Sequence, residues 1–151
     1  MMLSYERVFK IKDEITDVEL LKKLALSLFN DGLVKETFVQ AVVDREADYP
    51  TAIDIGTHSI AIPHTEFEHV IETGVAIAVL PNATVSFKSA DDPDITLNPS
   101  IVVMMALSPS TEKVEVIQKI FSYLGEYNNI KVICESDSNE KMLKQLKQIF
   151  P

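Results

Sequence analysis

The sequence predicts an α/β sandwich in which a mixed β-sheet is flanked by helices, and three observations support this fold class. Two continuously apolar runs rich in β-branched residues, at positions 74–80 and 101–107, are typical of fully buried strands. Stretches with the apolar spacing of amphipathic helices lie before and after them. The expected strands and helices do not alternate strictly, which favours a mixed sheet over a doubly wound nucleotide-binding fold.

The N-terminal part of the chain predicts a short strand followed by a well-defined helix. The strand covers residues 8–11. Thr16 and Glu19 have the spacing of a capping box, in which two side chains satisfy the free N–H groups at the start of a helix. An apolar stripe at helical spacing follows, and Gly32 supplies the expected stop.

A second helix is expected from about residue 35 to residue 48, with Arg45 near its last turn and Pro50 after its end. Helical periodicity is then lost for more than twenty residues. Within that stretch the run 60–62, followed by Pro63, reads as a buried strand stub that delivers the next residues to the surface.

The C-terminal half predicts two further helices and some shorter elements. Residues 85–88 form a candidate short strand. A helix is expected over 111–127 with Val114 in its core-facing stripe, and another over about 138–150. Residues 130–134 fit either a late strand or a helix tail.

Length and composition predict one domain over residues 1–151, because no repeat and no Gly/Ser-rich or Pro-rich linker interrupts the sequence. Cys134 is the only cysteine, so no internal disulfide can form, and a reducing cytoplasm is the expected compartment. The charged segment 1–14 lacks the apolar run of a signal peptide, and the longest apolar run is too short to span a membrane. Direct membrane insertion is therefore not expected.

The chain is acidic, with 14 Lys and Arg against 23 Asp and Glu and a formal net charge of −9. This balance repels phosphate backbones and anionic lipid head groups, so nucleic-acid binding is not expected. A protein partner with a basic rim would instead be attracted to this surface.

All three histidines of the chain, His58, His64 and His69, lie within the segment 58–69. His64 directly follows Pro63, whose ring fixes its own backbone φ and restricts the residue before it to extended geometry, so the imidazole is presented from a stiff stem. A neutral imidazole keeps one ring nitrogen unprotonated near pH 7, and that nitrogen can accept a phosphoryl group. We therefore predict His64 as a phosphorylated nucleophile.

Phosphoryl transfer also needs donors that stabilise the oxygens of the group in flight. Arg45 is the best candidate, because its helix ends in Tyr49-Pro50-Thr51 and leads directly into the histidine segment. A planar guanidinium binds a phosphate through paired hydrogen bonds. The alternative for Arg45 is a surface ion pair with Glu46 or Asp48. Thr51 either bonds the phosphate or caps a turn.

These residues resemble a known family. Arg45-Glu46, Pro50-Thr51 and the run Ile60-Ala61-Ile62-Pro63-His64 resemble the signature of the mannitol/fructose superfamily of phosphotransferase system (PTS) IIA components. The stretch Tyr49-Pro50-Thr51, the flanking histidines and Ala90-Asp91-Asp92 are most similar to the galactitol branch.

The resemblance implies a mixed sheet flanked by helices and a phosphoryl carrier without a cofactor. Such a carrier accepts phosphate on His64 from the histidine phosphocarrier protein. It passes the phosphate to a cysteine of the IIB component, with the membrane component IIC as indirect partner, for uptake of a sugar or alditol.

Two departures from the mannitol and fructose relatives affect the expected site. Thr65 stands where they have a glycine, and we expect Thr65 and Thr51 to be phosphate-binding residues. Many relatives also have a second active-site histidine further along, where the region 108–114 has Ser110 and Lys113 instead. We expect His58 to assist, because its even spacing from His64 would place both rings on one face of a flat strand.

Two other functions are compatible with the sequence. The chain could be a regulatory IIA-like sensor whose phosphorylation state controls a bound partner. It could also be a metal-dependent hydrolase in which the three histidines bind zinc, although neither a H-E-x-x-H motif nor a short paired spacing is present. No metal is therefore expected.

Overall fold

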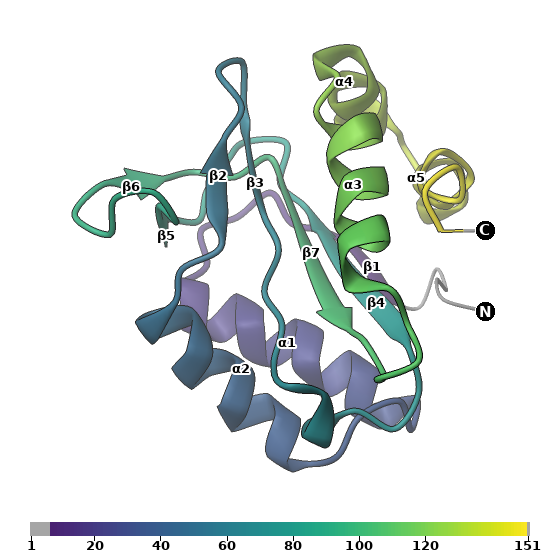
Figure 1. Ribbon diagram of the computed structural model, residues 1–151. Coiled ribbons are helices and arrows are strands. Elements are labelled where there is room, and N and C mark those ends of the chain that lie inside the picture. Colours follow the sequence, from purple (N-terminus) through teal and green to yellow (C-terminus); the bar gives the residue numbers. More distant parts are fainter. Residues whose placement is uncertain (1–6, 151) are drawn as a thin grey trace.

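The computed structural model describes residues 7–150 as one central sheet covered by helices on both faces (Figure 1). The five strands lie in the order β1-β4-β7-β3-β2. β1 pairs parallel with β4, β4 antiparallel with β7, β7 parallel with β3, and β3 antiparallel with β2. The strands are β1 (Val8–Lys10), β2 (Ala52–Asp54), β3 (Ser59–Ala61), β4 (Gly74–Val79) and β7 (Ile101–Ala106). The mixed sheet confirms the fold class predicted from sequence.

The remaining elements are a small hairpin and five α-helices. The hairpin pairs β5 (Phe87–Lys88) with β6 (Thr96–Leu97), and a short 3-10 turn, η2, spans Phe67–His69. The helices are α1 (Asp17–Asn30), α2 (Thr37–Asp48), α3 (Lys113–Leu124), α4 (Tyr127–Glu135) and α5 (Asn139–Leu146). None of the helices within residues 7–150 is long and apolar enough to cross a membrane.

Alternation along the two central strands builds a separate core on each face of the sheet. In β4 the odd positions 75, 77 and 79 pack beneath α3, α4 and α5, and in β7 the odd positions 101, 103 and 105 do the same. The even positions of both strands face α1 and α2. Ala76, Ala78 and Ala106 are among them, and their small side chains let those two helices pack close to the sheet.

Most of the expected elements are present. Thr16 caps α1 as predicted, since its hydroxyl accepts the N–H of Glu19 at 3.1 Å. The Glu19 carboxylate accepts the Thr16 hydroxyl at 2.9 Å, in place of the backbone bond that completes a capping box. Gly32 follows the helix with a φ of +74°, a left-handed conformation that glycine adopts without strain. The first six residues of the charged N-terminal segment, and residue 151, lie outside the described residues.

The structure decides one open expectation, corrects a second and adds a strand. Residues 130–134 belong to α4, because Ile130 and Ile133 are three positions apart on the helix face that packs under the sheet. Val114 is 60% exposed, and the buried stripe of α3 begins two residues later at Val116. Strand β2, at the sheet edge, was not expected from sequence.

The fold places the end of β3 beside the start of α3. Beyond β3 the chain stays extended through Pro63, whose carbonyl accepts the N–H of Met105 at 2.9 Å. His64 then forms an isolated parallel bridge with Met105, near the end of β7. The chain leaving β7 enters the turn before α3, so this turn lies next to His64.

Candidate functional site

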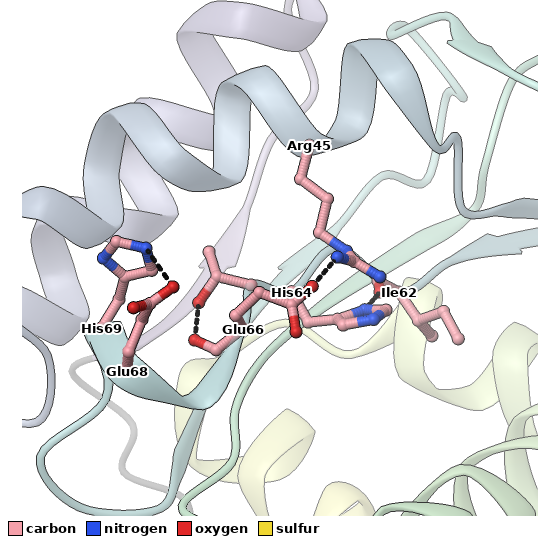
Figure 2. Close-up of polar contacts among 7 residues, drawn as sticks. Arg45, Ile62, His64, Glu66, Glu68 and His69 are labelled. Carbon is pink, nitrogen blue, oxygen red and sulfur yellow. Dashed lines mark hydrogen bonds and ion pairs between the residues drawn. The ribbon is translucent and has the colours of Figure 1, made fainter.

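The ring of His64 is held in one tautomer by a backbone carbonyl. Nδ1 lies 2.9 Å from the carbonyl oxygen of Ile62 (Figure 2). A carbonyl can only accept a hydrogen bond, so Nδ1 carries the proton and donates it. In the neutral ring the lone pair is therefore on Nε2, and within residues 7–150 no group forms a hydrogen bond with that nitrogen. Nε2 has the electronic state that a nucleophile requires.

The surroundings of His64 lower the pKa of its ring below the ordinary value of 6.5. Burial of the half-buried ring is the main cause, because it disfavours the charged imidazolium. The positive charges of Lys113 and Arg45 act in the same direction, whereas the Ile62 carbonyl and the charge of Glu66 oppose them. The ring is consequently neutral at pH 7.

Arg45 reaches from the last turn of α2 toward the ring of His64 (Figure 2). Its terminal nitrogen Nη1 forms an ion pair with Oε1 of Glu66, and its guanidinium lies 5.4 Å from the ring centroid of Tyr49. Nε of Arg45 is buried and has no hydrogen-bond partner among the residues described. The structure thus brings Arg45 and His64 together as the sequence predicted, and rejects ion pairs with Glu46 or Asp48.

A pocket of about 200 Å³ opens beside His64. One wall is the segment 64–67, which includes the expected phosphate-binding residue Thr65, and the other comes from the chain between β7 and the start of α3. Lys113, the first residue of α3, completes the second wall. The pocket therefore combines a neutral imidazole, a cation and several hydroxyl groups.

Thr51 lies outside this pocket, so the expectation that it binds phosphate is corrected. Its side chain is buried, and its hydroxyl donates to Oε1 of Glu46 at 2.7 Å while accepting the N–H of Ile62 at 3.1 Å. The single hydroxyl proton is already used within the protein. Thr51 instead fixes the strand that leads to His64.

His58 is also distant from His64, and its expected assisting role is corrected. It lies in the turn between β2 and β3, at the opposite end of the extended segment that carries His64 (Figure 1). Six residues of extended chain span about 20 Å. Nε2 of His58 donates to the carbonyl of Leu124 at 2.7 Å, and its Nδ1 accepts from the hydroxyl of Thr57 at 2.8 Å. His58 thus anchors the turn to the end of α3.

Replacing His58 by alanine should lower the free energy of unfolding by about 1 kcal/mol, the net value of one hydrogen bond. Phosphorylation of His64 should proceed at the wild-type rate, because the lost contact lies at the other end of the strand. Urea unfolding and a labelling time course check the two halves of this prediction. Slower labelling in a folded variant would contradict it.

The structure also separates the histidines that a metal site would need. Nδ1 of His69 lies 2.8 Å from the hydroxyl of Thr37, which ties η2 to α2. His58 is bound to Leu124. Within residues 7–150 no group of three His, Cys, Asp or Glu side chains is arranged to hold a metal ion. The geometry gives the hydrolase alternative no support.

Sequence reasoning missed Glu66 as the partner of Arg45 and did not assign Lys113 to the site. Glu66 is only two residues from His64, so its position in the histidine segment was a usable signal. Lys113 is brought to His64 by the pairing of β3 with β7. The available signal was the family resemblance, which matches the region 108–114 with the second active-site histidine of relatives.

The comparison with protein families agrees with this geometry. Residues 1–149 match the family described as "Phosphoenolpyruvate-dependent sugar phosphotransferase system, EIIA 2". The chain belongs to this family. The resemblance seen in the sequence is therefore confirmed, and the protein is a phosphotransferase component, a PTS IIA component of a sugar or alditol system.

Curated relatives of this IIA component include both galactitol and mannitol proteins. The galactitol-specific EIIA component of Escherichia coli K12 is 28% identical over 115 residues, which are 76% of this chain and 75% of that protein. The mannitol-specific EIICBA component of the same strain is 29% identical over 147 residues. That alignment covers 95% of this chain but only 22% of the longer protein.

Solved structures of IIA proteins share the fold. The crystal structure of the mannitol IIA from Escherichia coli superposes with a TM-score of 0.74 at 25% identity, covering 97% of this IIA component and 99% of that chain. A complex of the Escherichia coli mannitol IIA with its phosphorylated IIB gives a TM-score of 0.75 at 23% identity, covering 96% of each chain.

Proposed function

We propose that this IIA component accepts a phosphoryl group on Nε2 of His64 from the histidine phosphocarrier protein and passes it to a cysteine of a IIB component. The whole chain, residues 1–151, acts as one domain in this proposal. The membrane component IIC is an indirect partner, and the transported compound is a sugar or alditol of the galactitol kind.

The hydrogen bond from Nδ1 of His64 to the Ile62 carbonyl is the observation that carries the proposal. It leaves Nε2 unprotonated, and the lowered pKa of the ring keeps it so at neutral pH. The guanidinium of Arg45 supplies donors for the phosphoryl oxygens. Phe67 is 61% exposed at the rim of the pocket, so a protein partner would cover an apolar side chain there.

The two transfers balance without any further reactant. In the first, the lone pair of Nε2 attacks phosphorus, the N–P bond of the donor phosphohistidine breaks, and its electron pair returns to the donor ring. Nδ1 keeps its proton throughout. In the second, a cysteine thiolate of IIB attacks phosphorus, an S–P bond forms, and the electron pair of the N–P bond returns to Nε2.

A galactitol-like substrate is favoured by the chain organisation of the relatives. The relative named galactitol-specific is a separate EIIA chain of which three quarters align, whereas the mannitol-specific relatives are much longer EIICBA chains. A IIA chain is not expected to contact the sugar, so substrate choice belongs to the membrane partner.

Incubation with the phosphorylated phosphocarrier protein tests the proposal. We expect the intact mass to increase by one phosphoryl group, peptide mass spectrometry to place it on His64, and NMR of the ring to place it on Nε2. His64→Gln should not be labelled. The matched control His69→Gln, in which the lost ring contacts Thr37 outside the pocket, should be labelled normally.

Addition of a panel of IIB proteins then separates transport from regulation. Transfer to the cysteine of a galactitol-type IIB supports the proposal. A stable phosphohistidine that no IIB protein discharges would contradict the transport role and favour the regulatory alternative. Wild-type protein that takes up no phosphate from the phosphocarrier would overturn the proposal as a whole.

A further inference from the structure

Of the charged side chains around His64, two are paired with each other and one is not. Three charged groups act on the ring, namely Arg45, Glu66 and Lys113. Arg45 and Glu66 form an ion pair and largely neutralise each other. Lys113 has no carboxylate within ion-pair distance among residues 7–150. Its ammonium therefore provides the net positive charge of a site whose ligand would carry about two negative charges.

The position of Lys113 is set by a network of hydroxyl groups under the turn that precedes α3. The hydroxyl of Thr73 accepts the N–H of Ser108 at 3.1 Å and lies 3.0 Å from the Ser108 hydroxyl and 2.5 Å from that of Thr111. The N–H of Thr111 donates to the carbonyl of Ser108 at 3.0 Å. These bonds fix the turn through Thr111, two residues before the helix begins at Lys113.

Helix stability does not explain a lysine at this position. Lys113 is the first residue of α3, and a cation there opposes the positive end of the helix dipole. The side chain is exposed rather than packed in the core. It lines the same pocket as His64, from the wall opposite the segment 64–67.

We propose that Lys113 is a catalytic residue of the phosphoryl transfer, in which its ammonium binds the oxygens of the group that moves onto Nε2 of His64. This inference rests on the proposed function, and it gives Lys113 the assisting role first expected of His58. Arg45 and Lys113 then contact the phosphoryl group from different sides. Lys113 stays protonated, so the bond changes of the transfer are unaltered.

The two cations differ in what a phosphoryl group must displace in order to bind them. Binding of a phosphoryl group to Arg45 must compete with Glu66, which already occupies the guanidinium. Lys113 can bind the same group without displacing a carboxylate. We therefore expect Lys113 to contribute both to the maximal rate and to the stability of phosphohistidine.

Substitution of Lys113 tests this role. Lys113→Met should lower the maximal phosphorylation rate by about 10- to 100-fold, and the pKa of His64, followed by NMR, should rise. Lys113→Arg keeps the charge and should retain most of the rate. The matched control Lys119→Met removes the same charge from the same helix, where Lys119 pairs with Glu115 away from the pocket, and should keep the wild-type maximal rate.

Two donors separate catalysis from partner docking. Phosphoramidate is a small phosphoryl donor that has no docking surface, so a loss seen with both it and the phosphocarrier locates the effect in the transfer step. If the wild type is phosphorylated and the maximal rates of Lys113→Met and Lys119→Met are equal, the role of Lys113 is overturned and the proposed function stands. A wild type that neither donor labels would overturn the proposed function and this inference with it.

Discussion

Replacing Arg45 by methionine should lower the rate of phosphorylation of His64 by about 100- to 1,000-fold, the range found when one donor to a developing anionic oxygen is removed. The guanidinium reaches the ring from α2, and its buried Nε has no hydrogen-bond partner among the described residues. A buried N–H without a partner is unfavourable, and a ligand oxygen that reached it would satisfy it. Rapid-quench kinetics with the phosphocarrier protein measure the effect.

Arg45→Lys should recover only part of the loss. Lysine restores the charge but lacks the planar fork of donors that pairs with two phosphate oxygens. It also removes the guanidinium that packs over the ring of Tyr49. An Arg45→Lys rate equal to that of the wild type would show that charge alone is sufficient.

Glu66→Gln is the informative companion variant. The side chain of Glu66 is 63% exposed, and it forms an ion pair with Arg45 in the unphosphorylated protein. Removing the charge of Glu66 frees the guanidinium of Arg45, so Glu66→Gln should be phosphorylated a few-fold faster than the wild type. Arg45→Met should be phosphorylated more slowly than the wild type. Opposite effects from two residues joined by one ion pair would exclude a general loss of structure. A slower Glu66→Gln would instead indicate that the ion pair is needed to position Arg45.

The strands and helices that the sequence predicted correctly are those with strong local patterns. Residues 74–80 and 101–107 are apolar throughout because β4 and β7 are buried on both faces, a property that leaves a clear record in composition. The run 130–134 is shorter, and a short apolar run fits a strand and a helix equally well. Residues 130–134 form a helix because Ile130 and Ile133 pack against the sheet. That packing is a tertiary contact, which the local sequence does not show.

Site residues that are close together along the chain could be predicted from the sequence. Those brought together only by strand pairing in the sheet could not. Pro63 and His64 are adjacent, and Arg45 lies one helix end away, so local reasoning found both. The expectation for His58 considered only that residues at even spacing lie on one face of a strand. It did not consider that six residues of extended chain place the two rings far apart along the strand. Lys113 required the pairing of β3 with β7, which sequence periodicity does not reveal.

Glu46 connects the site to the stability of the fold. It is buried in α2, and its carboxylate accepts the N–H and the hydroxyl of Thr51 at 2.8 and 2.7 Å. The same hydroxyl accepts the N–H of Ile62, whose carbonyl in turn holds Nδ1 of His64. Burial raises the pKa of Glu46 from its ordinary value of 4.5 to about 7, although the bonds from Thr51 oppose the shift.

The raised pKa predicts that the folded state loses stability as the pH rises. A carboxyl group that binds its proton more tightly when folded favours folding most below the unfolded pKa, and that contribution is lost as the pH passes through the folded pKa. For Glu46 the window is pH 4.5 to about 7. A shift of this size corresponds to about 3 kcal/mol.

Glu46→Gln should remove this dependence. Between pH 5 and pH 8 the free energy of unfolding of the wild type, measured by urea denaturation, should fall by about 2–3 kcal/mol relative to the variant. Other titrating groups, His64 included, cancel in that difference because both proteins contain them. Asp48→Asn, which removes an exposed carboxylate from the same helix, should follow the wild type. Parallel curves for the wild type and Glu46→Gln would mean that Glu46 stays ionised across this range, with Thr51 compensating fully for its burial.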